Sequence, residues 1–142
     1  MTPADELAPR LLGALAEPPA RPLALLGRTG SGKTRLLRSV AARAGRDVVR
    51  ESTRDLVEQM TTAIRDDRYR RYREVFAGDE RPRFLEHVED LRGLAATRNE
   101  VRRLLQERAA RGRCTVLTMT RAREDAEVVE WLASWSELLA VD

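Results

Sequence analysis

The chain has 142 residues, a length that fits one domain, and 42% of them are hydrophobic, which suffices for one core. Charged residues make up 35%, yet the formal net charge is only +3, and so small an excess does not by itself indicate a nucleic-acid partner. The lone Cys114 excludes an internal disulfide, and one cysteine with one histidine cannot build a zinc site. Asp5 and Glu6 stand where a signal peptide has basic residues, and no apolar stretch approaches the ~18 residues of a membrane span. We therefore expect a soluble, cytoplasmic protein that does not contact a membrane.

The amino-terminal part of the chain predicts a helix, a linker and a buried strand. Leucines recurring every four residues give residues 3–16 one apolar helical face, with Thr2 as the cap of that helix. The proline-rich stretch 17–22 ends the helix and forms a stiff linker. Residues 23–26 are all apolar and predict a strand that is buried on both faces.

The rest of the chain alternates between helical and strand patterns. Further helices are expected at 32–44, 52–64, 66–78, 97–111 and 123–135, and further strands at 47–51, 83–88, 114–119 and 137–141. The sequence of Thr97–Glu100 matches a capping box that would open one helix, and Gly112 would end it. Strands separated by helical crossovers predict an α/β fold with three layers, in which about five parallel strands carry helices on both faces. Ligands of such sheets bind at the carboxyl ends of the strands.

A glycine-rich motif follows the first strand and opens the next helix. Gly27, Gly32, Lys33 and Thr34 match G-x-x-x-x-G-K-[ST], and Lys33 is the only lysine of an arginine-rich chain. Glycines let main-chain N–H groups surround phosphates, the lysine reaches the β- and γ-phosphates, and the Thr34 hydroxyl helps to hold Mg²⁺. The residues expected to bind nucleotide are Gly27, Arg28, Thr29, Gly30, Ser31, Gly32, Lys33, Thr34 and Arg35. The alternative, a chance glycine-rich turn, does not explain why lysine occurs only here, and we predict a P-loop NTPase fold.

Two classes of P-loop protein are excluded by their missing motifs. A guanine-specific GTPase needs Asn-Lys-x-Asp, but the only asparagine is Asn99 and the only lysine is Lys33. A transporter-type ATPase needs an LSGGQ-like signature, which the sequence lacks. Small-molecule kinases share the loop and add an arginine-rich lid, which the segment Arg65–Arg73 could imitate, so a small kinase or ATPase remains an alternative.

From about residue 22 onward the chain resembles the initiator clade of AAA+ ATPases, the DnaA-type replication initiators and their DnaA-like relatives. The resemblance rests on five segments in order: "LLGRTGSGKTRLLRSVA", "ESTRDLVEQMTTAIRDDRYRRYREVF", "FLEHVEDLRG", "TVLTMTR" and "EWLASWSELLAVD". It implies a helix and linker at 1–21, a nucleotide-binding AAA+ domain at 22–142, and the absence of the family's helical lid and DNA-binding domain.

The third of these segments departs from the family at the two carboxylates that organise Mg²⁺ and activate water. Glu86 stands where the family has the aspartate that organises Mg²⁺, and His87 where it has the carboxylate that activates water. The resemblance therefore assigns both Lys33 and Glu86 to catalysis. It assigns Thr34 and Glu86 to metal binding. Glu86 would hold Mg²⁺ through water. For His87 two interpretations stay open, a catalytic base and a plain residue at the end of a strand.

The last two segments depart from the family at its sensor and at its arginine. Thr120 stands at the position of the sensor aspartate, with Thr118 two residues earlier, and the resemblance gives both a sensor role. Trp135 stands near the arginine that reaches a neighbouring subunit's nucleotide, and tryptophan cannot supply that charge. Arg121 and Arg123 are the nearest candidates to replace it.

The segment Arg65–Arg73 mixes arginines with tyrosines and has two interpretations. Arginines with stacking rings could hold single-stranded DNA. Alternatively, Tyr69, Tyr72 and Phe76 pack inward and the arginines are solvated.

Taken with the resemblance, these features predict a DnaA-like module for replication initiation or its regulation. We expect it to bind ATP or ADP with Mg²⁺, to hydrolyse slowly or not at all, and to associate with an initiator or a helicase. Single-stranded DNA and self-association are further expected partners. The alternatives are an active small P-loop ATPase or kinase, and a scaffold that binds no nucleotide.

Overall fold

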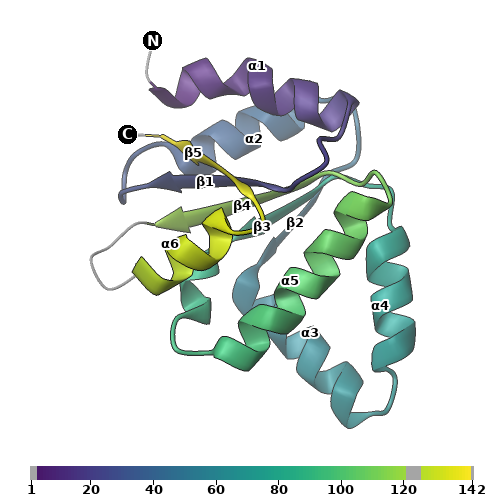
Figure 1. Cartoon of the computed structure of the whole chain (residues 1–142). Helices are drawn as coiled ribbons and strands as arrows, with labels where there is room; N and C mark the ends of the chain where they lie inside the picture. Colours follow the sequence, from purple (N-terminus) through teal and green to yellow (C-terminus); the bar gives the residue numbers. More distant parts are fainter. Residues whose placement is uncertain (1–2, 121–125, 142) are drawn as a thin grey trace.

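The computed structural model describes residues 3–120 and 126–141, which form one sheet and the helices around it (Figure 1). The elements are α1 (Pro3–Ala16), β1 (Leu23–Gly27), α2 (Lys33–Arg43), β2 (Val49–Ser52), α3 (Thr53–Arg65), α4 (Tyr69–Gly78), β3 (Arg83–Glu86), the 3₁₀ helix η1 (Val88–Leu91), α5 (Ala95–Ala110), β4 (Thr115–Thr120), α6 (Ala126–Ala133) and β5 (Glu137–Ala140). None of the helices in these two ranges is long and apolar enough to cross a membrane.

The sheet has five strands in the order β2-β3-β4-β1-β5, and all its pairings are parallel. This confirms the predicted α/β fold with a five-stranded parallel sheet. β1 lies between β4 and β5, and Leu23 pairs with Val116 on one side and Glu137 on the other. The carboxyl ends of β1, β3 and β4 therefore meet at one edge, where the phosphate loop begins.

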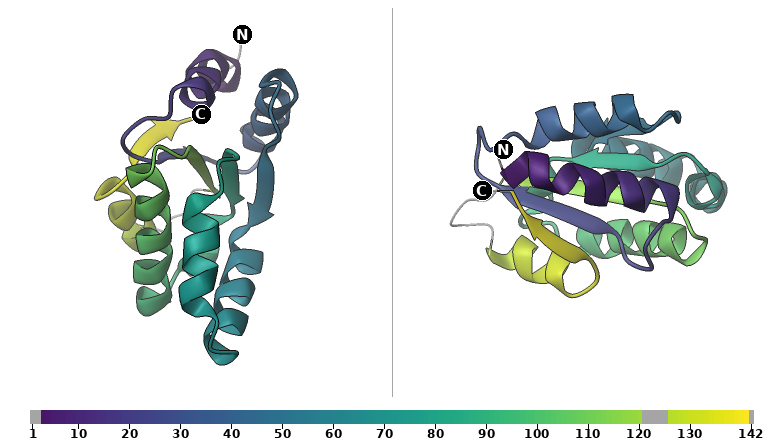
Figure 2. Two further views of the ribbon diagram at one scale, coloured as in Figure 1. Left: turned by 90° about the vertical axis from the view of Figure 1, so that its right-hand side faces the viewer. Right: turned by 90° about the horizontal axis from the view of Figure 1, so that it is seen from above.

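Helices cover both faces of the sheet, as predicted, and each face has its own core. Figure 2 shows α1 and α2 on one side of the sheet, with α3, α4 and α5 on the other. Leu23 and Leu25 of β1 pack under α1 and α2, whereas Ala24 and Leu26 point into the other core. A strand with both faces buried needs apolar residues at every position, which explains the unbroken run at 23–26.

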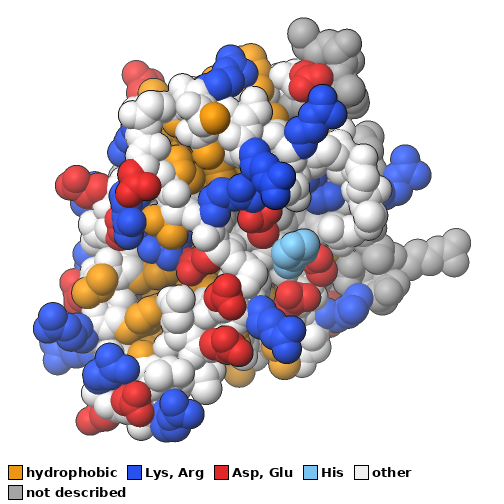
Figure 3. Space-filling view, turned by 180° about the vertical axis from the view of Figure 1, so that it is seen from behind, with side chains coloured by type: hydrophobic (Ala, Val, Ile, Leu, Met, Phe, Trp, Pro, Cys, Tyr) orange, Lys and Arg blue, Asp and Glu red, His pale blue; other side chains and the backbone are white. Residues whose placement is uncertain are grey.

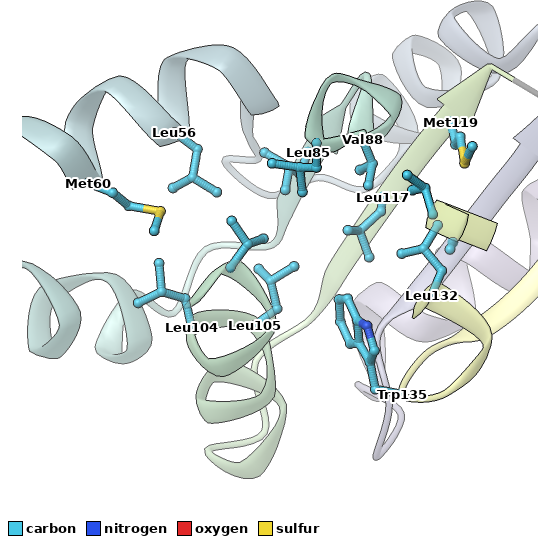
Figure 4. Close-up of a cluster of buried hydrophobic side chains, with 14 of the residues drawn as sticks. Leu56, Met60, Leu85, Val88, Leu104, Leu105, Leu117, Met119, Leu132 and Trp135 are labelled. Carbon is cyan, nitrogen blue, oxygen red and sulfur yellow. The ribbon is translucent and has the colours of Figure 1, made fainter. Parts of the chain in front are cut away.

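The core on the side of α3–α6 is the larger and joins all four helices to the sheet (Figure 4). Leu56 and Met60 of α3 meet Leu104 of α5, and Leu132 of α6 lies close to β4. Trp135 follows α6 and is only 3% exposed. Its ring contacts that of Trp131 edge-on, with 5.0 Å between the ring centroids.

Arg108 of α5 is fully buried and fastens the loop before β3 to the start of β4. Its guanidinium donates hydrogen bonds of 2.9–3.2 Å to the Thr115 hydroxyl and to the carbonyls of Phe76, Asp79, Arg81 and Cys114. Burial lowers the pKa of this guanidinium to about 10, so it stays charged at neutral pH and its hydrogen bonds are charge-assisted.

Besides the start of α5, four predicted boundaries lie two or more residues from those observed, and one of them is the strand expected at 47–51, which begins at Val49. The strand expected at 83–88 ends at Glu86, since His87 adopts a left-handed conformation with φ 64°. The helix expected from residue 66 begins at Tyr69, because Asp67 is left-handed, with φ 55°. The helix expected to run to Trp135 ends at Ala133, and its expected start at 123–125, like the Thr2 cap, lies outside the described residues.

The capping box predicted at Thr97–Glu100 is also wrong. α5 begins two residues earlier, at Ala95, and Leu94 precedes it without a side-chain cap. The first turn is closed by the Arg98 N–H, which donates to the Leu94 carbonyl at 2.8 Å. The other end follows the prediction: Gly112 is left-handed, with φ 75°, and its N–H donates to the Ala109 carbonyl at 3.0 Å.

Candidate phosphate-binding site

The loop between β1 and α2 leaves the amino terminus of α2 open to an anion. Gly30 and Gly32 have φ of 82° and 93°, a region that glycine enters without strain. Gly32 precedes α2 as its N-cap residue and, having no side chain, makes no side-chain cap hydrogen bond to the helix. Thr34 and Arg35 follow at this end and are exposed. The N–H groups and the positive dipole at the start of a helix can form an anion site.

Lys33 lies against the loop and is only 9% exposed. Its ammonium donates to the carbonyls of Gly27 at 2.7 Å and Arg28 at 3.0 Å, and to the Ser31 hydroxyl at 3.1 Å. A Cβ on Gly27 would lie 2.6 Å from that hydroxyl oxygen, so any larger residue where the strand meets the loop would displace Ser31. The single lysine thus sits at the centre of the loop, with its charge directed at main-chain oxygens.

A pocket of about 440 Å³ opens beside this loop and brings distant segments together. Its lining consists of Thr29, Gly30, Ser31, Gly32, Lys33, Thr34, Arg35, His87, Thr118 and Thr120. The two sensor candidates reach it because Thr118 and Thr120 pair with Leu25 and Gly27 in the register of β4 and β1. Thr118 is 5% exposed and Thr120 is half-buried.

Glu86 is absent from this lining, although it ends β3 nearby. Its carboxylate forms an ion pair with Arg50 of β2 at 3.0 Å. The Thr34 hydroxyl is therefore the only expected metal-binding side chain among the lining residues. In the described ranges no three acidic, histidine or cysteine side chains gather into a metal site. This donor set fits Mg²⁺ held mostly by phosphate oxygens and water, a common arrangement for that ion.

His87 also lines this pocket, and Glu89 of η1 contacts its ring. The His87 Nδ1 atom is 3.3 Å from one Glu89 oxygen, and the other Glu89 oxygen accepts from the Thr120 N–H at 3.1 Å. No sequence signal marks Glu89, because its two contacts arise only when η1 packs beside the end of β4.

The remaining candidates lie away from this pocket. Trp135, near the expected position of the family's arginine, is packed in the core, and Arg121 and Arg123 lie outside the described residues. The rings of Tyr69 and Tyr72 stack at 6.1 Å between centroids, and their packing against the core confirms the inward interpretation of these rings.

Two arginines of that segment border another pocket, of about 570 Å³, between α3 and α4. Arg68 and Arg71 line it together with Asp55 and Glu58, so its charge is mixed. It shares no lining residue with the pocket at the phosphate loop.

Comparison with protein families gives a match to a model described as an AAA domain over residues 23–140. Among solved structures, AMPPCP-bound DnaA from Aquifex aeolicus superposes with a TM-score of 0.77 at 20% identity, covering 100% of this chain and 47% of that one. A replication initiator DnaA bound to AMPPCP and single-stranded DNA gives 0.74 at 20% identity, with 96% and 44% covered.

A DnaC helicase loader gives a TM-score of 0.68 at 15% identity, with 98% of this chain and 90% of that chain covered. A comparison with curated protein sequences gives no match. At such identities the likeness shows the fold, and this chain spans a little under half of the DnaA chains.

Proposed function

Because the chain belongs to the AAA domain family and is a P-loop domain by its fold, we propose that it binds ATP or ADP and acts as a nucleotide-responsive interaction module. The observation that carries this proposal is the pocket at the phosphate loop. It joins Lys33, the amino-terminal end of α2 and the two threonines of β4 at one sheet edge. These are the groups that recognise a polyphosphate.

In this proposal residues Gly27–Arg35 wrap the phosphates, and each polar side chain has a separate task. Lys33 exchanges its loop acceptors for the β- and γ-phosphate oxygens. Thr34 contributes its hydroxyl to Mg²⁺, which would neutralise phosphate charge when bound. Glu86 contributes to the metal only through water, since its carboxylate is paired with Arg50. Thr118 and Thr120 face the terminal phosphate and sense its presence.

We propose that hydrolysis is slow or absent. Phosphoryl transfer depends on charges positioned around the transferred group. Here the carboxylate at the end of β3 is engaged by Arg50, and the residue near the family's arginine position is the buried Trp135. An active small ATPase or kinase is the alternative, and steady-state phosphate release separates the two.

For partners we propose a component of the replication machinery, an initiator or a helicase. Support comes from the likeness in fold to DnaA and to a helicase loader. Exposed arginines within Arg65–Arg73 would add contacts to single-stranded DNA through phosphates rather than by stacking, because the tyrosines there are packed. We also propose self-association, and a division into a helix with linker at 1–21 and the nucleotide-binding domain at 22–142.

Titration with fluorescently labelled ADP and ATP tests the central proposal. Lys33→Ala removes the ammonium, and we expect at least about a tenfold loss of affinity, equivalent to ~1.4 kcal/mol. Lys33→Arg should lose nearly as much, because a planar guanidinium does not replace a compact ammonium inside the loop. Arg38→Ala, on the exposed side of α2, is the matched control and should bind as the unchanged protein does.

Two outcomes would contradict the proposal. Equal and negligible affinity in the unchanged protein and in Lys33→Ala would leave only the scaffold alternative. Rapid, Lys33-dependent phosphate release would contradict slow hydrolysis and favour the small ATPase or kinase.

A further inference from the structure

The pocket of about 570 Å³ between α3 and α4, which we call the α3–α4 groove, combines apolar and charged side chains. Its apolar lining residues include Ala63 of α3 and Tyr72 and Val75 of α4. Val75 is 64% exposed, one of three large hydrophobic side chains that residues 3–120 and 126–141 leave exposed. Figure 3 shows hydrophobic side chains on the surface over α3 and α4, with charged side chains of both signs around them. An apolar strip within a charged rim is typical of a surface that binds another protein.

The two helices run antiparallel, so the α3–α4 groove has two different ends (Figure 1). At the turn between the helices, the Arg68 N–H donates to the Ala63 carbonyl at 2.7 Å. Farther along, the Tyr72 hydroxyl donates to the Gln59 Oε1 atom at 3.4 Å. The start of α4 therefore lies beside the end of α3, and the start of α3 lies beside the end of α4.

Acidic side chains line one half of the groove and basic side chains line the other. Asp55 and Glu58 belong to the first half of α3, whereas Arg68 and Arg71 stand at the start of α4. All four side chains are exposed, and of the four only Arg68 forms an ion pair with another described residue, Asp66, at 3.3 Å. The groove thus has an acidic half and a basic half whose charges are largely unmatched within the described chain.

The basic half also stands at an unfavourable place in its own helix. α4 has no acidic residue in its first turn, and Arg71 is its third residue. The amino terminus of a helix carries a partial positive charge, which attracts anions and repels cations. Local helix stability therefore does not explain these arginines, whereas carboxylates supplied from outside the chain would relieve the repulsion.

We propose that the α3–α4 groove is the surface through which two copies of this chain associate, related by a two-fold axis that crosses the groove at right angles to its helices. The proposal rests on the self-association proposed above and assigns a surface to it. Such an axis reverses the two ends, so the acidic half of each copy lies over the basic half of the other. Glu58 of one copy then faces Arg71 of the other, Asp55 faces Arg68, and the apolar strips meet between them.

Single-stranded DNA is the other candidate for the basic half. A strand laid along the groove would also meet Asp55 and Glu58, which repel phosphates. A second copy satisfies both halves at once, and for this reason we assign the groove to it. Arg65 and Arg70 are exposed but do not line the groove, so they stay available for contacts to DNA.

Sedimentation equilibrium of charge-reversed variants tests the surface. Arg71→Glu and Glu58→Arg each place like charges opposite one another twice in the dimer, and each should weaken dimerisation at least about tenfold. Mixed in equal amounts, the two variants should form a heterodimer, because both contacts then join opposite charges. The double variant Glu58→Arg/Arg71→Glu should dimerise for the same reason. Arg38→Glu, exposed on α2 across the sheet, is the matched control and should dimerise as the unchanged protein does.

Thermal unfolding and nucleotide titration exclude a trivial loss of the dimer. Arg71→Glu places an acidic residue in the first turn of α4, where the helix dipole favours it, so its Tm should be no lower than that of the unchanged protein. Affinity for labelled ADP should be the same in both single variants, because the groove shares no lining residue with the pocket at the phosphate loop.

The possible failures can be told apart. A protein that stays monomeric at every concentration would overturn both the self-association and its assignment to the groove, while titration with labelled ADP still decides nucleotide binding. A dimer that persists in both single variants would keep the self-association but overturn the assignment to the groove. If Arg71→Glu abolishes binding of a labelled oligothymidylate and mixing the variants restores no dimer, the groove binds DNA and the inference is wrong.

Discussion

Replacing Gly27 by alanine tests whether nucleotide binding depends on the close contact between β1 and the phosphate loop. The new Cβ would lie 2.6 Å from the Ser31 Oγ and 3.2 Å from the Cβ atoms of Ser31 and Val141. A distance of 2.6 Å is too short for a contact between non-bonded carbon and oxygen atoms, so Ser31 must move. Its hydroxyl accepts from Lys33 at 3.1 Å, and moving it also displaces the lysine that we assign to the phosphates.

The size of the effect follows from the cost of forcing a methyl group into a packed site, about 1–3 kcal/mol. If binding requires the original loop, the whole cost appears in the affinity, which falls by about 5- to 150-fold at ~1.4 kcal/mol per factor of ten. Titration with labelled ADP measures it. Gly13→Ala in α1 is the control, because a Cβ there meets nothing within 4 Å.

A second substitution makes this reasoning refutable. Ser31→Gly removes both serine atoms that lie closest to the new methyl group and leaves the Val141 Cβ at 3.2 Å. Gly27→Ala should therefore cost far less in a Ser31→Gly background than in the unchanged protein. If the alanine variant binds as the unchanged protein does, or if its loss is the same in both backgrounds, the contact does not control binding.

Three further predictions concern stability and reactivity. Arg108→Met should lower the free energy of unfolding by at least about 3 kcal/mol, because several buried carbonyls lose their donor at about 1–3 kcal/mol each; urea denaturation measures it, and a loss below about 1 kcal/mol would contradict the assigned hydrogen bonds. Hydrogen bonds from Arg81 and the charge of Arg83 hold the pKa of Asp79 well below its ordinary 3.8. Ionised Asp79 therefore stabilises the folded protein above pH 3.8, and this contribution is lost as the pH falls toward the lowered pKa of the folded state. Asp79→Asn should therefore flatten the acid side of the stability curve, and an unchanged slope would refute the pairing. Burial raises the pKa of Cys114 from 9.0 to about 11, so near pH 8 the folded protein should react with a thiol reagent at least about 100-fold more slowly than the urea-unfolded chain, and equal rates would show that the thiol is accessible.

The sheet could be predicted from sequence because strands buried on both faces require apolar residues at nearly every position. β1 and β4 are buried on both faces and consist almost entirely of apolar residues and threonine, so residues 23–26 and 114–119 identified them closely. Helix starts were harder to predict. Ser52 caps α3 by accepting from the Asp55 N–H at 3.1 Å, whereas the predicted capping box at Thr97–Glu100 lies inside α5. There the start is set by the turn after η1, which no local propensity encodes.

The candidate site also has one part that the sequence predicted and another that it did not. The phosphate loop is contiguous in the chain, so its residues could be assigned from spacing and its glycine angles follow from their type. Glu86 and His87 were assigned by position along a strand, and the structure turns one to Arg50 and the other to the pocket. The backbone angles between two adjacent residues decide whether their side chains reach the same site. The left-handed turn at His87 could not be predicted, because no glycine marks it in the sequence.

The position of β1 between β4 and β5 has a consequence for how the molecule is made. Translation produces β1 well before β4 and β5, its two hydrogen-bonded neighbours, because Glu137, the β5 partner of Leu23, lies far later in the sequence. The Val141 N–H, which donates to the Leu26 carbonyl at 2.8 Å, arrives later still. During translation the apolar segment 23–26 therefore has no sheet to join, and the nascent chain exposes it to chaperones and to aggregation. A nucleotide can stabilise this loop only once β4 and β5 have joined the sheet, so ligand present in the cell would favour the finished domain without guiding its first folding steps.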